Sequence, residues 1–323
     1  MVEYISLKEF KNFEKLRKLW NKEYKRTFPL SERMFQERVI DDQNLDYYAS
    51  TVAVFEGSAI GFILIKTWQV ESPFYKDENN AYISLIFVAK DYRDKHVGSE
   101  LLEVSLKTLI KNEKIKELRL GDDILNLFPG LPNELNESTM FFLNRGFKSS
   151  EGVVDMIKVI KKKNKNDYNL TSKLEIRIAT EDDKDNLLKL CLNGNYLKEA
   201  YLINHYFERG GTGRRLVVGS LNDKIVGFSR IYDRKKTATK INMFTDKTIG
   251  SLSMLVVDKS LNDFKEFQKD LSVGSEHYLI MRKCKKIIIE SVSAIDYYKE
   301  LGYRVFKYYL NFVLNLDEFR NKI

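Results

Sequence analysis

One order of strand and helix signals occurs twice along this chain. In each half, a strand hairpin is followed by a buried strand, a helix, a short strand, a short helix ending at a glycine, and a last strand. Three pairs of short motifs keep the same order in both halves: Gly61-Phe62 and Gly227-Phe228, Val97–Glu100 and Val273–Glu276, and Arg145–Phe147 and Leu301–Tyr303. Because the period far exceeds the roughly 20–50 residues of solenoid repeats, the pattern indicates a tandem duplication of one α/β unit.

Hydrophobic periodicity assigns the individual elements. In the first half it predicts a helix over 9–23, two strands over 51–68, a buried strand over 81–89, a helix from 97, a strand over 116–120, a short helix over 138–147 and a strand over 153–160. In the second half it predicts a strand over 174–180, a helix over 181–192, a hairpin over 214–232, a strand over 251–257, a helix from 272, a strand over 286–290, a short helix over 293–303 and a strand over 306–316.

The length of 323 residues exceeds what one hydrophobic core usually serves, so two domains are expected. The stretch 161–173 is polar, rich in lysine and aperiodic, which is typical of a linker. A nucleic-acid or membrane patch is the other reading, but no aromatic residues interleave its lysines. We therefore expect an N-terminal domain over 1–160 and a C-terminal domain over 174–323.

The repeated Val-Gly-Ser-Glu motif lies between a buried strand and an amphipathic helix. At such a junction the first backbone N–H groups of the helix have no intrahelical partners, and the helix dipole adds partial positive charge. Gly98 and Gly274 would let a ligand approach the backbone closely, so the motif predicts a cradle for phosphate groups. The alternative is that each glycine only permits close packing of helix on strand. No P-loop or Rossmann fingerprint is present.

The motifs together resemble the GNAT superfamily of acetyl-CoA-dependent N-acetyltransferases. The loop pattern of that family is matched by Val88, Arg93, Gly98 and Leu101-Leu102. The pattern of its last helix is matched in the second half by Ala294, Tyr298, Gly302 and Tyr303. The resemblance implies an α/β protein of two GNAT domains. Each would have a mixed, mostly antiparallel sheet flanked by helices, with a splayed parallel strand pair.

The resemblance also implies that the chain binds acetyl-CoA. In the first unit the expected cofactor-binding residues are Phe87, Val88, Arg93, Asp94, Lys95, His96, Val97, Gly98 and Ser99. In the second unit they are Val257, Lys269, Ser272, Val273, Gly274 and Ser275. The two copies depart from the family differently. His96 replaces a glycine and Phe142 replaces the usual tyrosine in the first unit, whereas Lys269 and Ser272 weaken the loop pattern of the second.

The implied reaction is acetyl transfer to a primary amine by direct attack on the thioester. The family pattern assigns Tyr298 as the proton donor to the leaving thiolate. A backbone N–H of the splayed strand, within 84–88 or 253–257, would hold the oxyanion. Candidate bases are Asp122, which follows the strand over 116–120, and Glu290, which ends the strand over 286–290, although either could equally be a helix-capping charge. No histidine has a partner at metal-like spacing, so no metal site is predicted.

The expected partner is a small-molecule amine, and the protein is expected to be a monomer or a homodimer. The net charge of +8 suits anionic partners, but no motif supports nucleic-acid binding. No apolar run is long enough to span a bilayer, and no secretory signal pattern occurs at the start. With only Cys191 and Cys284, which read as small core residues, the chain is expected in the cytoplasm.

The sequence leaves two other functions open. A partly degenerate tandem protein could serve as an acetyl-CoA-binding scaffold or sensor, since the better loop and the tyrosine lie in different units. An aminoacyl transferase of the peptidoglycan-bridge type also pairs two GNAT-like units. It usually has a longer chain with a helical insertion, and neither is seen here.

Overall fold

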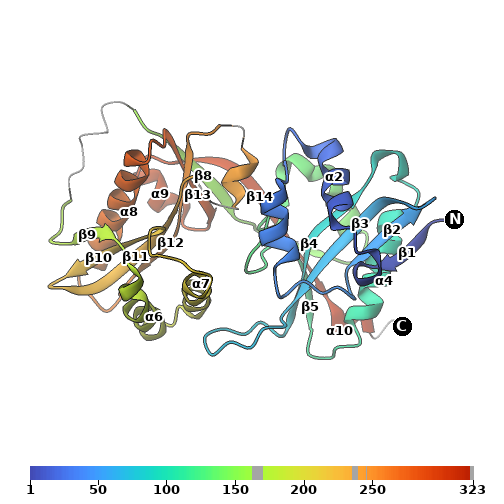
Figure 1. Ribbon diagram of the computed structural model, residues 1–323, viewed down its shortest axis with the longest axis horizontal. Helices are drawn as coiled ribbons and strands as arrows, with labels where there is room; N and C mark the ends of the chain where they lie inside the picture. The colour runs from blue at the N-terminus through green and yellow to red at the C-terminus, as the bar shows by residue number, and fades with distance from the viewer. Residues whose placement is uncertain (162–169, 235–238, 245, 321–323) are drawn as a thin grey trace.

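The computed structural model describes residues 1–161, 170–234, 239–244 and 246–320. Most of the predicted linker, residues 162–169, lies outside the described residues. The molecule has two lobes that lie side by side, and the order of elements in the first lobe recurs in the second (Figure 1). Among the described residues, none of the helices combines the length and the apolar character that crossing a bilayer requires.

The first half contains a block of five neighbouring strands with helices on both faces. The strands are β1 (Glu3–Ser6), β2 (Thr51–Phe55), β3 (Ser58–Thr67), β4 (Asn80–Val88) and β5 (Glu117–Leu120). The helices are α1 (Leu7–Phe10), α2 (Phe13–Tyr24), α3 (Glu32–Phe35), α4 (Val97–Leu109) and α5 (Thr139–Leu143). Short strands follow as β6 (Leu131–Pro132), β7 (Lys148–Ser150) and β8 (Val154–Val159). One apolar cluster lies under α4 and α5 and another under α2 and α3, so the sheet separates two cores.

The second half repeats this plan. Its strands are β9 (Glu175–Ile178), β10 (Leu216–Leu221), β11 (Lys224–Tyr232), β12 (Ile249–Val257), β13 (Lys286–Val292) and β14 (Arg304–Asn315). Its helices are α6 (Lys184–Asn193), α7 (Leu197–Glu208), α8 (Phe264–Met281), α9 (Ile295–Glu300) and α10 (Leu316–Arg320), with a 3₁₀ turn η6 (Lys240–Met243). As predicted for the fold, β4 runs parallel to β5 and β12 runs parallel to β13, whereas the remaining neighbours pair antiparallel.

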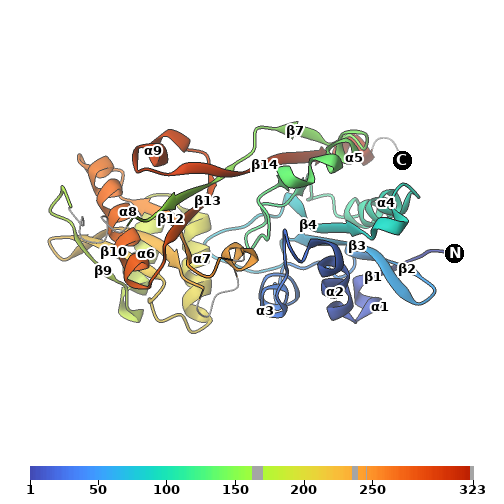
Figure 2. The ribbon, with the colours of Figure 1, turned by 90° about the horizontal axis from the view of Figure 1, so that it is seen from above.

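The last strands of the two halves are exchanged. The strand order is β1-β2-β3-β4-β5-β14-β8-β13-β12-β11-β10-β9. Thus β8, from the first half, pairs with β13, and the end of β14, from the second half, pairs with β5 and β7. Figure 2 shows β14 passing from the lobe with α9 to the lobe with α5. The predicted division into 1–160 and 174–323 follows the order of the repeats, but strand pairing crosses it.

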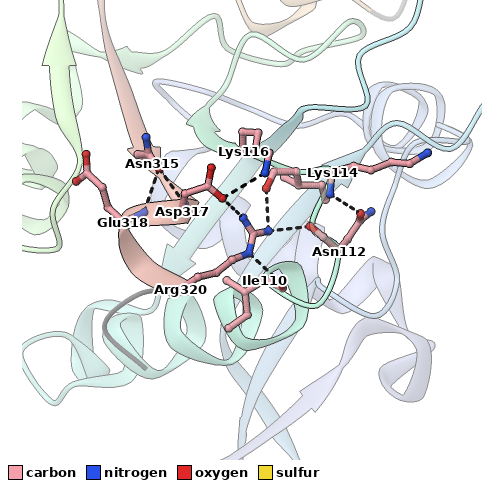
Figure 3. A network of polar contacts seen from close by, with 9 residues as sticks. Ile110, Asn112, Lys114, Lys116, Asn315, Asp317, Glu318 and Arg320 are labelled. Carbon is pink, nitrogen blue, oxygen red and sulfur yellow. Dashed lines mark hydrogen bonds and ion pairs between the residues drawn. The ribbon is translucent and has the colours of Figure 1, made fainter.

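The C-terminal helix α10 is fixed on the first lobe (Figure 3). The Arg320 guanidinium donates hydrogen bonds to the backbone carbonyls of Ile110 (3.2 Å), Asn112 (2.8 Å) and Ile115 (2.9 Å). It also forms an ion pair with Asp317 at 2.5 Å. These acceptors follow α4, so the end of the second half closes a face of the first.

The helix expected to begin at Ser272 is wrong in its start, because α8 begins at Phe264. Phe264, Phe267 and Leu271 lie three and four residues apart and pack into the core of the second lobe. This apolar stripe extends the helix backward to Phe264, ahead of the repeated motif. The second Val-Gly-Ser-Glu motif therefore lies in the middle of a helix, where backbone N–H groups bond the preceding turn.

Candidate active site

A cavity of about 650 Å³ lies in the first unit. The cavity is lined by Trp20, Tyr24, Ile83 to Val88, Arg93, Asp94, His96 to Ser99, Leu120, Gly121, Phe128, Gly130 to Pro132, Leu135, Glu137, Ser138, Phe141, Phe142 and Arg145. Leu85 and Phe87 belong to the core under α2, whereas Ile86 and Val88 pack with α4 on the other face. Since residues of both faces line one cavity, it passes through the sheet.

The passage exists because β4 and β5 separate. Their parallel pairing ends at Ile83 and Leu120, but β4 continues to Val88. Gly121 directs the chain away with a left-handed backbone (φ +68°). A Cβ there would lie 2.4 Å from the carbonyl oxygen of Phe128, so no other residue fits without displacing the loop. The splayed parallel pair that the sequence predicted is thus present in the first unit.

The N-terminus of α4 opens into this cavity. The N–H groups of Val97, Gly98 and Ser99 precede the first bond of the helix, from the N–H of Glu100 to the carbonyl of His96 (3.0 Å). His96 has a left-handed backbone (φ +62°), which turns the chain sharply before the helix. A Cβ on Gly98 would lie 3.1 Å from the Phe141 ring, so glycine keeps this end open. These features fit a phosphate-bearing ligand.

Two arginines lie beside the cradle. The Arg145 guanidinium donates to Ser99 Oγ and to the carbonyl of Phe141 (2.8 Å), and it stacks 3.8 Å from the centre of the Phe141 ring. Partial burial lowers the pKa of Arg145, although an arginine remains charged. Arg93 donates to the carbonyl of Val88 (2.9 Å) and pairs with Glu23. Arg145 therefore carries the less compensated positive charge.

Most of the residues expected to bind the cofactor in the first unit line the cavity. They are Phe87, Val88, Arg93, Asp94, His96, Val97, Gly98 and Ser99. Lys95 is different, because its exposed ammonium donates to the carbonyl of Asp91 (2.9 Å). The loop around Pro129 also reaches the cavity through Phe128, Gly130 and Pro132.

The cofactor residues expected in the second unit do not form a cradle. Val257 is buried at the end of β12. The others lie inside α8: Lys269, Ser272, Val273, Gly274 and Ser275. Ser275 Oγ donates to the carbonyl of Leu271 (2.6 Å), and Ser272 Oγ lies 3.1 Å from Tyr297 Oη. The expectation of free helix N-terminal amides here is wrong, since the helix begins two turns earlier.

The three catalytic candidates lie in different surroundings, and Asp122 is the one that directly follows a lining residue, Gly121. Asp122 follows β5 and is partly exposed to solvent. Loss of hydration raises the pKa of its carboxyl group, and the positive charge of Lys198 lowers it by a smaller amount. Glu290 accepts a hydrogen bond from Ser251 Oγ (2.7 Å). Tyr298 packs against Tyr297 and Tyr303, and burial raises its pKa to about 12. Within the described ranges, none of the three is among the residues that surround the cavity.

The sequence reasoning missed several residues of the cavity. Trp20 and Tyr24 come from α2; helical spacing marked Trp20 only as an apolar helix position, and Tyr24 lies just beyond the predicted helix over 9–23. Glu137 and Ser138 lie in the turn before α5, which carries no recognisable motif. Arg145 was part of a repeated motif but was given no role. Ser84 lies inside an apolar strand, where a single serine carries no signal.

Residues 13–126 match the model of the acetyltransferase (GNAT) family. This segment includes α2, β4, the cradle and β5. Among curated protein sequences, none matches the chain at a significant level.

Solved structures resemble the complete chain. A GCN5-related glucosamine N-acetyltransferase region of a fungal multi-domain GH3 β-N-acetylglucosaminidase is similar over 97% of this chain, with a TM-score of 0.80 and 16% identity; this chain spans 38% of that one. A tandem GNAT protein from the clavulanic acid biosynthesis pathway is similar over 98% of this chain and 99% of its own, with a TM-score of 0.66 and 11% identity.

A third similar structure is the N-myristoyltransferase of Saccharomyces cerevisiae. It is similar over 97% of this chain and 80% of its own, with a TM-score of 0.60 and 11% identity. Identities this low show the fold alone, whereas the family model adds the sequence pattern of the first unit. Residues 13–126 thus match the sequence pattern of the acetyltransferase (GNAT) family, and the chain as a whole has a fold similar to that of a tandem GNAT protein.

Proposed function

We propose that the chain is an acyl-CoA-dependent N-acetyltransferase whose first unit holds acetyl-CoA and transfers its acetyl group to a small-molecule primary amine. The observation that carries the proposal is the cavity that joins the open N-terminus of α4 to the gap between β4 and β5. The amides of Val97, Gly98 and Ser99, with Arg145 beside them, would bind the diphosphate. The thioester would lie in the gap, where an amine can reach it.

The chain's own residues would contribute to the reaction mainly by position and electrostatics. The splayed part of β4, from Ser84 to Val88, supplies backbone groups beside the thioester. Phe142, at the position where the family pattern has tyrosine, has no hydroxyl and is buried in the core under α5. The amine must lose a proton, and water in the cavity is the simplest acceptor. We assign no side chain of this unit as general base.

A scaffold role for the second unit, without a cofactor of its own, is the alternative that a specific observation favours. Phe264, Phe267, Leu271 and Tyr298 pack together against β12 and β13, which is where the cofactor would enter. Such a unit would act as a scaffold, since β14 pairs through Tyr309 and Leu310 with Pro132 and Leu131 of the first unit's cavity wall. The cytoplasmic location and the oligomeric state stay predictions.

The proposal predicts that one molecule of acetyl-CoA binds per chain and that a primary amine among small amines, amino sugars and polyamines releases CoA. Titration calorimetry gives the stoichiometry, and a thiol reagent measures release. Two molecules per chain would restore the second unit as a cofactor site. Binding without release over the whole amine panel would favour the scaffold or sensor reading.

Tyr298→Phe tests directly which unit is catalytic. If the first unit does the chemistry, the variant is expected to keep the turnover and the acetyl-CoA affinity of the wild type. The reason is that its hydroxyl lies on α9 of the other lobe, away from the residues that surround the cavity. Turnover is measured as CoA release at saturating substrates. A loss of tenfold or more with unchanged melting temperature would assign proton chemistry to Tyr298 and contradict the proposal.

A further inference from the structure

Ser84 occupies a special place on β4. It is the first residue of the strand beyond Ile83, where the pairing with β5 ends. On the other side, Ile83 pairs with Ile65 and Leu85 pairs with Leu64, so Ser84 has no residue opposite it on β3. This is a β-bulge, a device that re-aims a side chain and is frequent next to active sites.

The hydroxyl of Ser84 is buried and lacks a hydrogen-bond partner. The residue is 4% exposed, and its Oγ meets no donor or acceptor in the part of the chain that the structure describes. Ser84 also lines the cavity at the gap between β4 and β5. A buried polar atom without a partner is rare, since its desolvation is uncompensated.

Other buried serines satisfy their hydroxyls within the protein. Ser105 Oγ lies 3.2 Å from Thr51 Oγ1, and Ser275 Oγ donates to the carbonyl of Leu271 (2.6 Å). Both lie on helices that pack against the sheet. Burial alone therefore does not explain the state of Ser84. The difference is that Ser84 is one of the residues that line the cavity, so its partner is expected on a ligand.

We propose that the Ser84 hydroxyl is a hydrogen-bond donor to the carbonyl oxygen of the acyl thioester, and that it holds the oxyanion together with a backbone N–H of β4. The inference rests on the proposed function of this cavity. It makes Ser84 a catalytic residue of the first unit.

Acetyl transfer leaves Ser84 chemically unchanged. The lone pair of the neutral amine forms a bond to the carbonyl carbon, and the π electrons of the C=O bond move to oxygen, where Ser84 donates its hydrogen bond. When the pair returns, the C–S bond breaks and CoA leaves as thiolate. Water takes the proton that the nitrogen loses and returns one to sulfur. The serine keeps its proton and acts by stabilising the charge.

The first test is Ser84→Ala, with Ser105→Ala as the matched control for loss of a buried serine hydroxyl. Wild type and both variants are expected to bind acetyl-CoA with similar affinity in calorimetry. Ser84→Ala is expected to lower kcat roughly 100-fold, the effect of removing one donor from an oxyanion site. Ser105→Ala is expected to keep its kcat within about twofold.

A second readout does not depend on turnover. In the infrared spectrum of bound acetyl-CoA labelled with ¹³C at the thioester carbonyl, the wild type is expected to show a band shifted to lower frequency than free acetyl-CoA. Ser84→Ala is expected to move this band toward the free value. An unchanged band and kcat would overturn the role of Ser84 while leaving the proposed function intact. If wild type bound no acetyl-CoA, both would fall.

Ser84→Cys covers the case in which the alanine variant does not fold. A thiol has nearly the same shape but is a weak donor, so most of the loss in kcat and in band shift is expected to remain. A folded cysteine variant with the turnover and the band of the wild type would equally overturn the inference.

Discussion

Replacing Gly98 by glutamate is expected to abolish acetyl-CoA binding by the first unit. The Cβ position already lies 3.1 Å from the Phe141 ring, and a longer side chain would enter the space before the first turn of α4. The carboxylate would then face the diphosphate across the same amides. Juxtaposing like charges in a binding site costs several kcal/mol, which corresponds to a loss of affinity of at least about a hundredfold.

Calorimetry with acetyl-CoA measures the effect, and two further variants separate its causes. Gly98→Gln adds almost the same bulk without charge and is expected to retain more affinity than the glutamate variant. Gly98→Ala requires Phe141 to move by a few tenths of an ångström and is expected to weaken binding only slightly. Unchanged affinity in Gly98→Glu would mean that the glycine serves packing alone and that the cofactor binds elsewhere.

The first cradle could be predicted from the sequence because its determinants are local. An apolar strand, a tight turn and a glycine in the first helical turn follow one another within 81–98, and the structure places them as expected. The second motif has the same four letters but a different context. Phe264 and Phe267 extend the apolar stripe of the helix backward, and this packing decides where α8 begins.

The strand exchange could not be read from the sequence. The segments 153–160 and 306–316 each read correctly as a strand, but periodicity identifies a strand without naming its partner. All four strands that pair with β14 are antiparallel to it, and exchange of equivalent last strands leaves the hydrophobic pattern of each half unchanged. Ser84 could not be predicted for a related reason. Its position is special because the pairing of β4 with β5 ends beside it and because β4 bulges against β3, and both features depend on strand register.

The second large expected effect concerns the polar network at this exchange. Asp155 on β8 is fully buried, and its Oδ1 accepts hydrogen bonds from the Lys240 ammonium (2.7 Å) and the backbone N–H of Ser291 (3.1 Å). Its Oδ2 accepts one from the Tyr309 hydroxyl (2.7 Å). One carboxylate thus joins β8, β13, β14 and η6. Burial raises the pKa of Tyr309 well above its usual value, and the contact with the Asp155 carboxylate raises it further.

Asp155→Ala is expected to destabilise the chain by about 3–5 kcal/mol, because it leaves the ammonium of Lys240 buried without its counter-charge. The melting temperature, measured by calorimetry, is expected to fall by roughly 10 °C. Acetyl transfer should decline as well, since Tyr309 pairs with Pro132 of the cavity wall. Weaker pairing of the exchanged strands would therefore disturb the cavity wall of the first unit.

Two controls decide whether burial of the charge is the cause. Asp296→Ala removes the partner of Lys299 from an ion pair whose carboxylate is 91% exposed, and it is expected to change stability by less than about 0.5 kcal/mol. The double variant Asp155→Ala/Lys240→Met removes both buried charges and is expected to recover much of the lost stability. If Asp155→Ala melted within about 2 °C of the wild type, the network would not hold the exchanged strands. The cohesion of the two units would then rest on their backbone pairing and apolar contacts alone.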